Sequence, residues 1–240
     1  MRIMWFAIGL ACLATPLWAQ QVSFSIADGG SLTTRTVQIF TLITVLSLVP
    51  GLAVMVTCFP FIVTVLAILR QALGLQQSPP NMLIVSLALF LTYFVMEPVF
   101  TQAWVHGVQP LIDGSITPEV AFTKVAEPFR VFMAARLDHA TFAELRSLRP
   151  DFAEVKTTTN APLSLLVPSF LLSEIQRAFE IGFLVYLPFL IIDLVVAAVL
   201  MSMGMMMVPP AIVSLPFKLA FFVVANGWTL VAGALVRSYF

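Results

Sequence analysis

Uncharged apolar stretches separated by short polar breaks dominate the chain. Residues 37–69 contain no acidic or basic side chain, and as one helix they would measure roughly 50 Å. The hydrocarbon core of a bilayer is only about 30 Å thick. Because Pro50-Gly51 and Pro60 interrupt the stretch, the pattern predicts a kink or a tight hairpin within it.

A second uncharged stretch covers residues 82–96, after a polar loop that contains Pro79-Pro80. It is too short for a comfortable membrane span before Glu97-Pro98 interrupts it. We therefore assign residues 20–105 to an N-terminal region of hydrophobic helical hairpins.

Residues 106–160 differ in kind, because residues 106–156 carry 13 of the 24 charged side chains. Apolar residues recur there at helical spacing, which predicts a charged helical domain with one apolar face and a solvated surface. We interpret residues 157–162 as a linker. The recurring apolar residues are Phe122, Phe129, Phe132, Met133, Leu137, Phe142 and Leu145.

Two long apolar stretches close the chain, at residues 181–208 and 209–236, with a turn at 204–210 between them. Residues 161–240 thus form a C-terminal region with an amphipathic helix and a hydrophobic hairpin. Ahead of the hairpin, Glu174, Arg177 and Glu180 form one charged stripe. A solvated face is the simplest interpretation of this stripe, and an inter-subunit contact is the more specific one. No β-type alternation stands out, so the predicted fold class is all-α: membrane-derived helical hairpins with an extracytoplasmic helical domain.

The first 19 residues are typical of a secretory signal peptide. Arg2 supplies the positive charge, a short apolar region follows, and Pro16 precedes a cleavage site after Ala19. A retained first membrane helix is the alternative. With the signal removed, the charged domain is expected in the periplasm and the last turn toward the cytoplasm.

Composition supports a membrane protein with protein partners. The 240 residues are 60% hydrophobic and only 10% charged, and the mean hydropathy is +1.01. Acidic and basic residues balance at 12 each, so no polybasic region indicates nucleic-acid binding. The prolines and poor segment lengths indicate that much of the apolar surface meets other subunits rather than lipid.

No catalytic, cofactor-binding or metal-binding pattern is present, so we do not expect an enzyme. His106 and His139 have no metal-ligand partner at helical spacing. Cys58 is the one cysteine beyond the signal peptide, and a small buried side chain is its simplest interpretation.

Five methionines crowd the turn between the closing stretches: Met201, Met203, Met205, Met206 and Met207. Methionine repacks against surfaces of varied shape, so a ring of such side chains from several copies could form a deformable seal. Core packing at a helix end is the alternative, and composition alone favours it.

Asp193 and Lys218 are single charges inside the two closing stretches. A charge at mid-bilayer depth costs about 2.5–3.5 kcal/mol on insertion scales, so such residues usually face a protein interior. Folding the stretches back about Met207 places Asp193 opposite residue 221, one turn from Lys218, and predicts an ion pair within the hairpin. A proton-coupling role for Asp193 is the alternative.

Several runs together resemble the FliP family. They are LRQALGLQQSPPN at 69–81, LALFLTYFVMEPV at 87–99, PSFLLSEIQRAFEIGF at 168–183 and LPFLIIDLVVAAVLMSMGMMMVPPAIVSLPFKLAFFV at 187–223, followed by NGWTL. The resemblance extends from about residue 35 to the end and is weakest in the middle of the charged domain.

The resemblance implies a core subunit of the flagellar type III export gate in the bacterial inner membrane. Several copies would assemble with FliQ- and FliR-type subunits, and unfolded flagellar proteins would pass through. It also implies that Met205, Met206 and Met207 lie at a constriction that holds ions back. The chain departs from the family at Cys58-Phe59-Pro60-Phe61, where Ser-Phe-Thr-Arg is frequent, and at Asn226, where Asp is frequent.

Three other functions stay open at this point. The equivalent subunit of a virulence-type injectisome shares the fold, although the signal peptide and Pro209-Pro210 favour the flagellar system. A small-solute channel would need no partners. A membrane enzyme is disfavoured by the lack of clustered ligands or a nucleophile–base pair.

Overall fold

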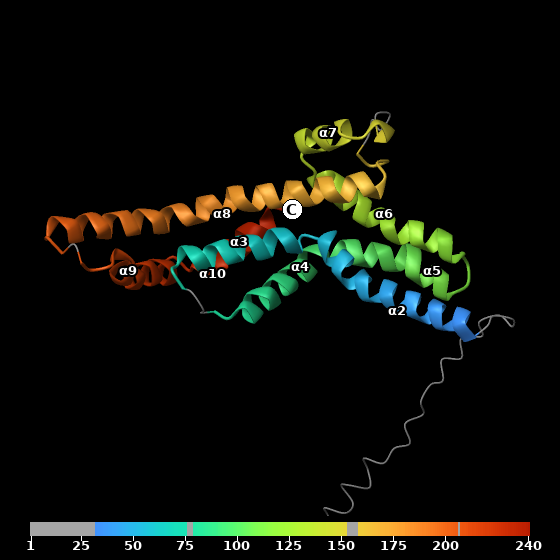
Figure 1. Cartoon of the computed structure of the whole chain (residues 1–240), viewed down its shortest axis with the longest axis horizontal. Helices are drawn as coiled ribbons and strands as arrows, with labels where there is room; N and C mark the ends of the chain where they lie inside the picture. The colour runs from blue at the N-terminus through green and yellow to red at the C-terminus, as the bar shows by residue number, and fades with distance from the viewer. Residues whose placement is uncertain (1–31, 76–78, 153–157, 206) are drawn as a thin grey trace, which may run out of the picture. The chain divides into compact units, whose positions relative to one another are not determined.

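The computed structural model describes residues 32–75, 79–152, 158–205 and 207–240, and these residues form helices and turns without any strand (Figure 1). This confirms the all-α prediction. The predicted signal peptide, residues 1–19, lies outside the described residues. The helices are α2 (Leu32–Met55), α3 (Phe59–Ala72), α4 (Asn81–Ala103), the π-helix η1 (Trp104–Val108), α5 (Gln109–Ile112), α6 (Pro118–Arg136), α7 (His139–Ser147), the 3-10 helix η2 (Pro150–Phe152), α8 (Leu163–Ser202), α9 (Pro210–Val224) and α10 (Gly227–Arg237).

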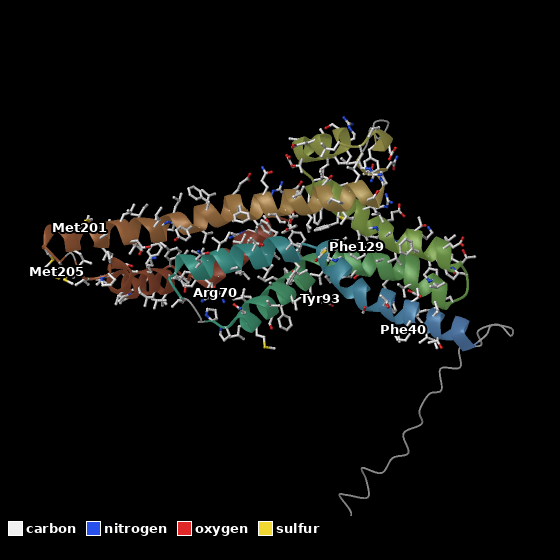
Figure 2. The ribbon with its side chains drawn as sticks, in the orientation of Figure 1. Phe40, Arg70, Tyr93, Phe129, Met201 and Met205 are labelled. Atoms are coloured by element: carbon white, nitrogen blue, oxygen red, sulfur yellow. The ribbon has the colours of Figure 1, made fainter. Side chains whose placement is uncertain are left out.

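The chain divides into two compact units, residues 1–46 and 47–240, and the boundary falls inside α2. In the first unit, the hydroxyls of Thr41 and Thr44 donate to the carbonyls of Val37 and Phe40, one helical turn earlier. The Phe40 side chain is exposed (Figure 2). Helices α3 to α10 all belong to the second unit.

The expected interruption of the first apolar stretch falls at residues 56–58. Helix α2 continues through Pro50 and Gly51 to Met55. Helix α3 then begins at Phe59, with Pro60 in its first turn. Proline is tolerated there because the N–H that it lacks would have no partner within the helix.

The second apolar stretch is longer than the sequence pattern suggests. Helix α4 continues through Pro98, and the helical run reaches Ile112 by way of η1 and α5, which makes 32 residues. The expected boundary after residue 105 therefore lies inside a continuous helical run. Gly107 in η1 permits close packing by α6, since a Cβ there would lie 2.4 Å from Val125 Cγ2 and 2.9 Å from the Val125 backbone nitrogen.

Helix α8 is the central element, with α3, α6, α7 and α9 packed along its 40 residues (Figure 1). The expected amphipathic helix and the first closing stretch are thus one helix. It begins directly after the predicted linker and passes through Pro168 and Pro188. The main core lies between α3, α4, α8 and the last helices. Its largest fully buried side chains include Phe61, Ile62, Leu66, Leu69, Leu73, Met96 and Leu235.

The charged segment is helical, as its spacing predicts, and it packs on its neighbours. Helix α6 contacts α4 and α8, and α7 contacts α8. A second core joins α6, α7 and the start of α8 through Met133, Phe142 and Phe170.

Two helical runs are long and apolar enough to cross a membrane, Asn81–Ile112 and Leu163–Ser202. Helices α9 and α10 are long and apolar enough only when taken together. They meet at a 62° bend, so they would make a third span only as one broken span. Asn226 forms the bend with a left-handed backbone at φ 50°. Asparagine tolerates this conformation better than other residues with a Cβ.

Candidate functional site

The methionine-rich turn begins where a glycine capping motif ends α8. Gly204 has a left-handed backbone with φ +75°, its N–H donates to the Met201 carbonyl, and the Met205 N–H donates to the Leu200 carbonyl. These two bonds define a Schellman motif, which satisfies the last carbonyls of α8 and turns the chain sharply. The turn therefore sits at a fixed place beyond Ser202.

Met201 and Met205 lie at the tip of the α8–α9 hairpin (Figure 2). Met205 is 40% exposed and Met207 is 97% exposed, while Met201 and Met203 are also exposed. Met206 lies outside the described residues. Packing in the chain's own core, the alternative that composition favours, does not describe the four methionines within the described residues, because all four are exposed.

The structure brings Asp193 of α8 and Lys218 of α9 together. Lys218 Nζ lies 2.6 Å from Asp193 Oδ2. Two further groups complete the network: the Ser214 hydroxyl donates to Asp193 Oδ1 at 2.6 Å, and Lys218 Nζ donates to the Ala72 carbonyl of α3 at 3.0 Å. The residues of α9 that face Asp193 are therefore 214 and 218, rather than 221 as expected from a fold-back about Met207.

Burial of Lys218 makes this ion pair important for stability. Lys218 is 5% exposed, whereas the Asp193 side chain keeps 32% of its surface accessible. A buried ammonium without its carboxylate is strongly destabilising, because desolvation is no longer offset. The pair therefore ties α9 to α8, and the Ala72 carbonyl ties both to the end of α3.

Glu174 does not belong to a solvated stripe or to an outward-facing contact, which corrects the sequence expectation for this residue. Its side chain has 0% exposure within the chain. Arg136 Nε of α6 lies 3.1 Å from Glu174 Oε1, and the Tyr239 phenol donates to Glu174 Oε2. The stripe argument fails here because α6 folds over this part of α8 and supplies an internal cation.

Arg177 and Glu180 remain on the accessible side of α8. Arg177 is half-buried, and Glu180 is exposed and accepts a hydrogen bond from Gln176 Nε2 at 3.2 Å. Both stay predicted inter-subunit contacts. His106 and His139 are exposed. Within the described residues, no group of three or more His, Cys, Asp or Glu side chains is placed to hold a metal ion.

Two apolar hollows open on the second unit. One, of about 690 Å³, lies between the start of α3, α4, α6 and α8, with Tyr93 and Phe129 in its lining (Figure 2). The other, of about 550 Å³, lies between α8 and α9 and is lined by residues such as Val195 and Phe217. Exposed apolar surface of this extent is typical of a protein that meets lipid or other subunits.

Hydrogen bonds of Asp138 at the start of α7 also hold the charged segment against α8. The Asp138 side chain caps α7 by accepting from the Thr141 N–H at 2.8 Å, and the Asp138 N–H donates to Ser173 of α8 at 3.0 Å. The hydrogen bond from the Thr141 N–H holds the pKa of the Asp138 carboxyl below its usual value.

Together these features define a class: a helical membrane protein with an apolar hairpin, an ion pair with a buried lysine inside it and exposed methionines at its tip. The chain belongs to the FliP family, whose model matches residues 42–235. Flagellar biosynthetic protein FliP of Caulobacter vibrioides is 48% identical over 97% of this chain and 88% of its own length. The FliP proteins of Agrobacterium fabrum and Rhizobium meliloti are 46% and 44% identical, over 90% and 100% of this chain and 89% and 99% of their own lengths.

Proposed function

We propose that this chain is a core subunit of the flagellar type III protein export gate, through which unfolded rod, hook and filament proteins cross the inner membrane. Family membership supports this assignment, and the matched relatives carry flagellar names. Those names favour the flagellar system over the injectisome alternative. A small-solute channel gains no support from either the family or the geometry.

The exposed methionine turn carries the mechanistic part of the proposal. The side chains of Met205 and Met207, with Met206 between them in sequence, would line a constriction when several copies meet. Thioethers on flexible, unbranched side chains can close around polypeptides of varied sequence. An apolar constriction also resists hydration, which would hold ions back between substrates.

The apolar surface supports assembly with other subunits. The hollow between α4, α6 and α8 and the one between α8 and α9 leave large side chains accessible in a single chain. Additional copies of this chain, together with FliQ- and FliR-type subunits, would cover them. Arg177 and Glu180 would contribute polar contacts at the rims of such interfaces.

We place the charged segment, residues 106–160, in the periplasm and the membrane-embedded helices in the inner membrane. The apolar runs Asn81–Ile112 and Leu163–Ser202 support a membrane location. The energy for export would come from other components, since this chain would act as a conduit and not as an enzyme.

The decisive experiment replaces Met205, Met206 and Met207 with Ala in the only chromosomal copy. Secretion of hook and filament protein, swimming, and membrane ion leak are measured in the same cells. We expect complexes that still assemble but leak ions or lose control of export, because alanine leaves the constriction open.

Met82→Ala is the matched control. Met82 is 81% exposed but lies at the start of α4, away from the hairpin tip. It should leave export and ion leak unchanged. Normal export with no leak in the triple variant would remove the seal from the proposal, whereas loss of the assembled complex would be separated from leak by measuring complex abundance.

A further inference from the structure

Residues 238–239, directly after α10, are half-buried and pack against the core of the second unit. The end of the chain lies beside α3 and α8 in Figure 1. The Tyr239 ring packs edge-on against Phe61 of α3 at 5.6 Å between centroids and stacks on Phe132 of α6 at 6.0 Å. Its phenol donates to Glu174 of α8. One side chain thus contacts three helices.

Arg136 completes this junction from the α6 side. Its guanidinium lies over the Tyr239 ring, with Cζ 4.0 Å from the centroid. Nη1 donates to the Ser238 carbonyl at 2.7 Å, while Nε pairs with Glu174. The same cation therefore binds both the backbone and the ring of the segment after α10. Cation–π and charge-assisted contacts of this kind strengthen when they are desolvated.

The bend at Asn226 explains why such a fastening matters. Helix α9 is held at Lys218, by Asp193 and the Ala72 carbonyl. Helix α10 follows a 62° bend, so a single left-handed residue joins it to this anchor. Contacts at residues 238–239 hold the far end of α10 against α6 and α8, so α10 is anchored at both ends.

We propose that residues 238–239 form a clasp: docking of Tyr239 against Arg136, Glu174 and Phe61 locks α10 across the core. The clasp is a property of this chain's fold and stands whether or not the methionine seal is correct. Its release uncovers the part of the core that contains Cys58, because Tyr239 packs against the buried cluster to which Cys58 and Phe61 belong.

Cys58 provides a native reporter for the clasp. Its side chain is fully buried, and replacing Cys12 by Ser leaves it as the only thiol of the full chain. The rate of alkylation by N-ethylmaleimide is measured on the purified chain in detergent. Tyr239→Ala should raise the rate at least about tenfold, because labelling of a buried thiol follows the population of the opened state. Tyr239→Phe, which keeps the ring and loses only the phenol, should raise it by a smaller factor.

Two controls separate release of the clasp from general loosening. Phe240→Ala removes a neighbouring ring that is 79% exposed and should leave the labelling rate unchanged. Phe142→Ala creates a similar cavity in the second core, away from Cys58, and should raise the rate much less than Tyr239→Ala. A wild-type labelling rate in Tyr239→Ala, or equal rates in Tyr239→Ala and Phe142→Ala, would overturn the clasp.

A double-mutant cycle tests the proposed contact itself. If the Tyr239 phenol acts through Glu174, Tyr239→Phe and Glu174→Gln combined should accelerate labelling by less than the product of their separate factors. Independent effects would mean that the phenol acts through another group, and the assignment of Glu174 as its partner would then be wrong.

Discussion

Helix α8 carries two ion pairs in unlike surroundings, and their difference shows what burial does to a charge. Glu174 pairs with Arg136 beneath α6 and has no exposure, whereas Asp193 pairs with Lys218 within the apolar hairpin and keeps about a third of its side chain accessible. The first pair joins a charged segment to the core. The second joins two apolar helices. The more deeply buried carboxylate belongs to the more polar part of the sequence, so local composition is a poor guide to burial.

Removing the deeper carboxylate should have the largest effect. Glu174→Ala leaves the Arg136 guanidinium, whose Nη2 already has no partner in the described structure, without its counter-charge. Breaking a buried pair in this way costs about 3–5 kcal/mol. The measurement is denaturant unfolding of the full chain in detergent. Glu180→Ala, one exposed carboxylate further along the same helix, is the control and should change stability by less than about 0.5 kcal/mol.

Removing the charge of Asp193 should reduce stability by less, and a second substitution should recover most of the loss. Asp193→Asn leaves the Lys218 ammonium without a counter-charge, with only neutral acceptors such as the Ala72 carbonyl around it. The loss should fall somewhat below the about 3–5 kcal/mol of a fully buried pair, since water reaches this site. Adding Lys218→Met removes the orphaned charge and should restore most of the stability. If the double variant is no better than Asp193→Asn, the lysine is not what makes the single change costly.

Ser214 sharpens the comparison on a smaller scale. Ser214→Ala removes the hydroxyl that donates to Asp193 but leaves the ion pair intact. A hydrogen bond to a partly solvated carboxylate should contribute about 1.5 kcal/mol, at the low end for bonds to charged groups. Ser202→Ala is the matched control, because that exposed hydroxyl bonds only to its own helix at Val199. Equal stabilities of the two variants would contradict a role for Ser214 in the network.

The smallest effect concerns a carboxylate outside both pairs. The folded-state pKa of Asp138 is depressed, so its charge stabilises the fold above the unfolded-state pKa of about 4, and this contribution disappears as pH falls through the folded value. Asp138→Asn keeps a capping oxygen and loses only the charge. Thermal unfolding should show a small deficit at neutral pH that vanishes in acid. A deficit independent of pH would assign the effect to geometry instead.

The hairpin was the part most accessible to prediction from the sequence. Asp193 and Lys218 are single charges among apolar residues, so each is expected to pair with an opposite charge. The turn between the two stretches limits which residues can face each other. The prediction missed the register, because the Schellman motif at Gly204 ends α8 earlier than a fold-back about Met207 assumes. Ser214 and the Ala72 carbonyl were missed as well, since a serine and a backbone oxygen carry no distinctive sequence signal.

The junction around Glu174 was not predicted. Arg136 lies 38 residues before Glu174, within a segment rich in both charges, and Tyr239 lies 65 residues after it. Helical spacing groups Glu174 with Arg177 and Glu180, but it cannot tell which of the three a neighbouring helix will cover. The isolated Tyr239 near the end of an apolar stretch was the one available signal, because a buried phenol usually seeks a hydrogen-bond partner.

The length of α8 has a consequence for how the protein sits in the cell envelope. Forty residues at about 1.5 Å each give a rod of roughly 60 Å, about twice the thickness of the hydrocarbon layer. Tilting can absorb only part of such a hydrophobic mismatch. A rod of this length therefore reaches beyond the hydrocarbon layer, and a lipid-attached quencher should reach only a limited window along this helix.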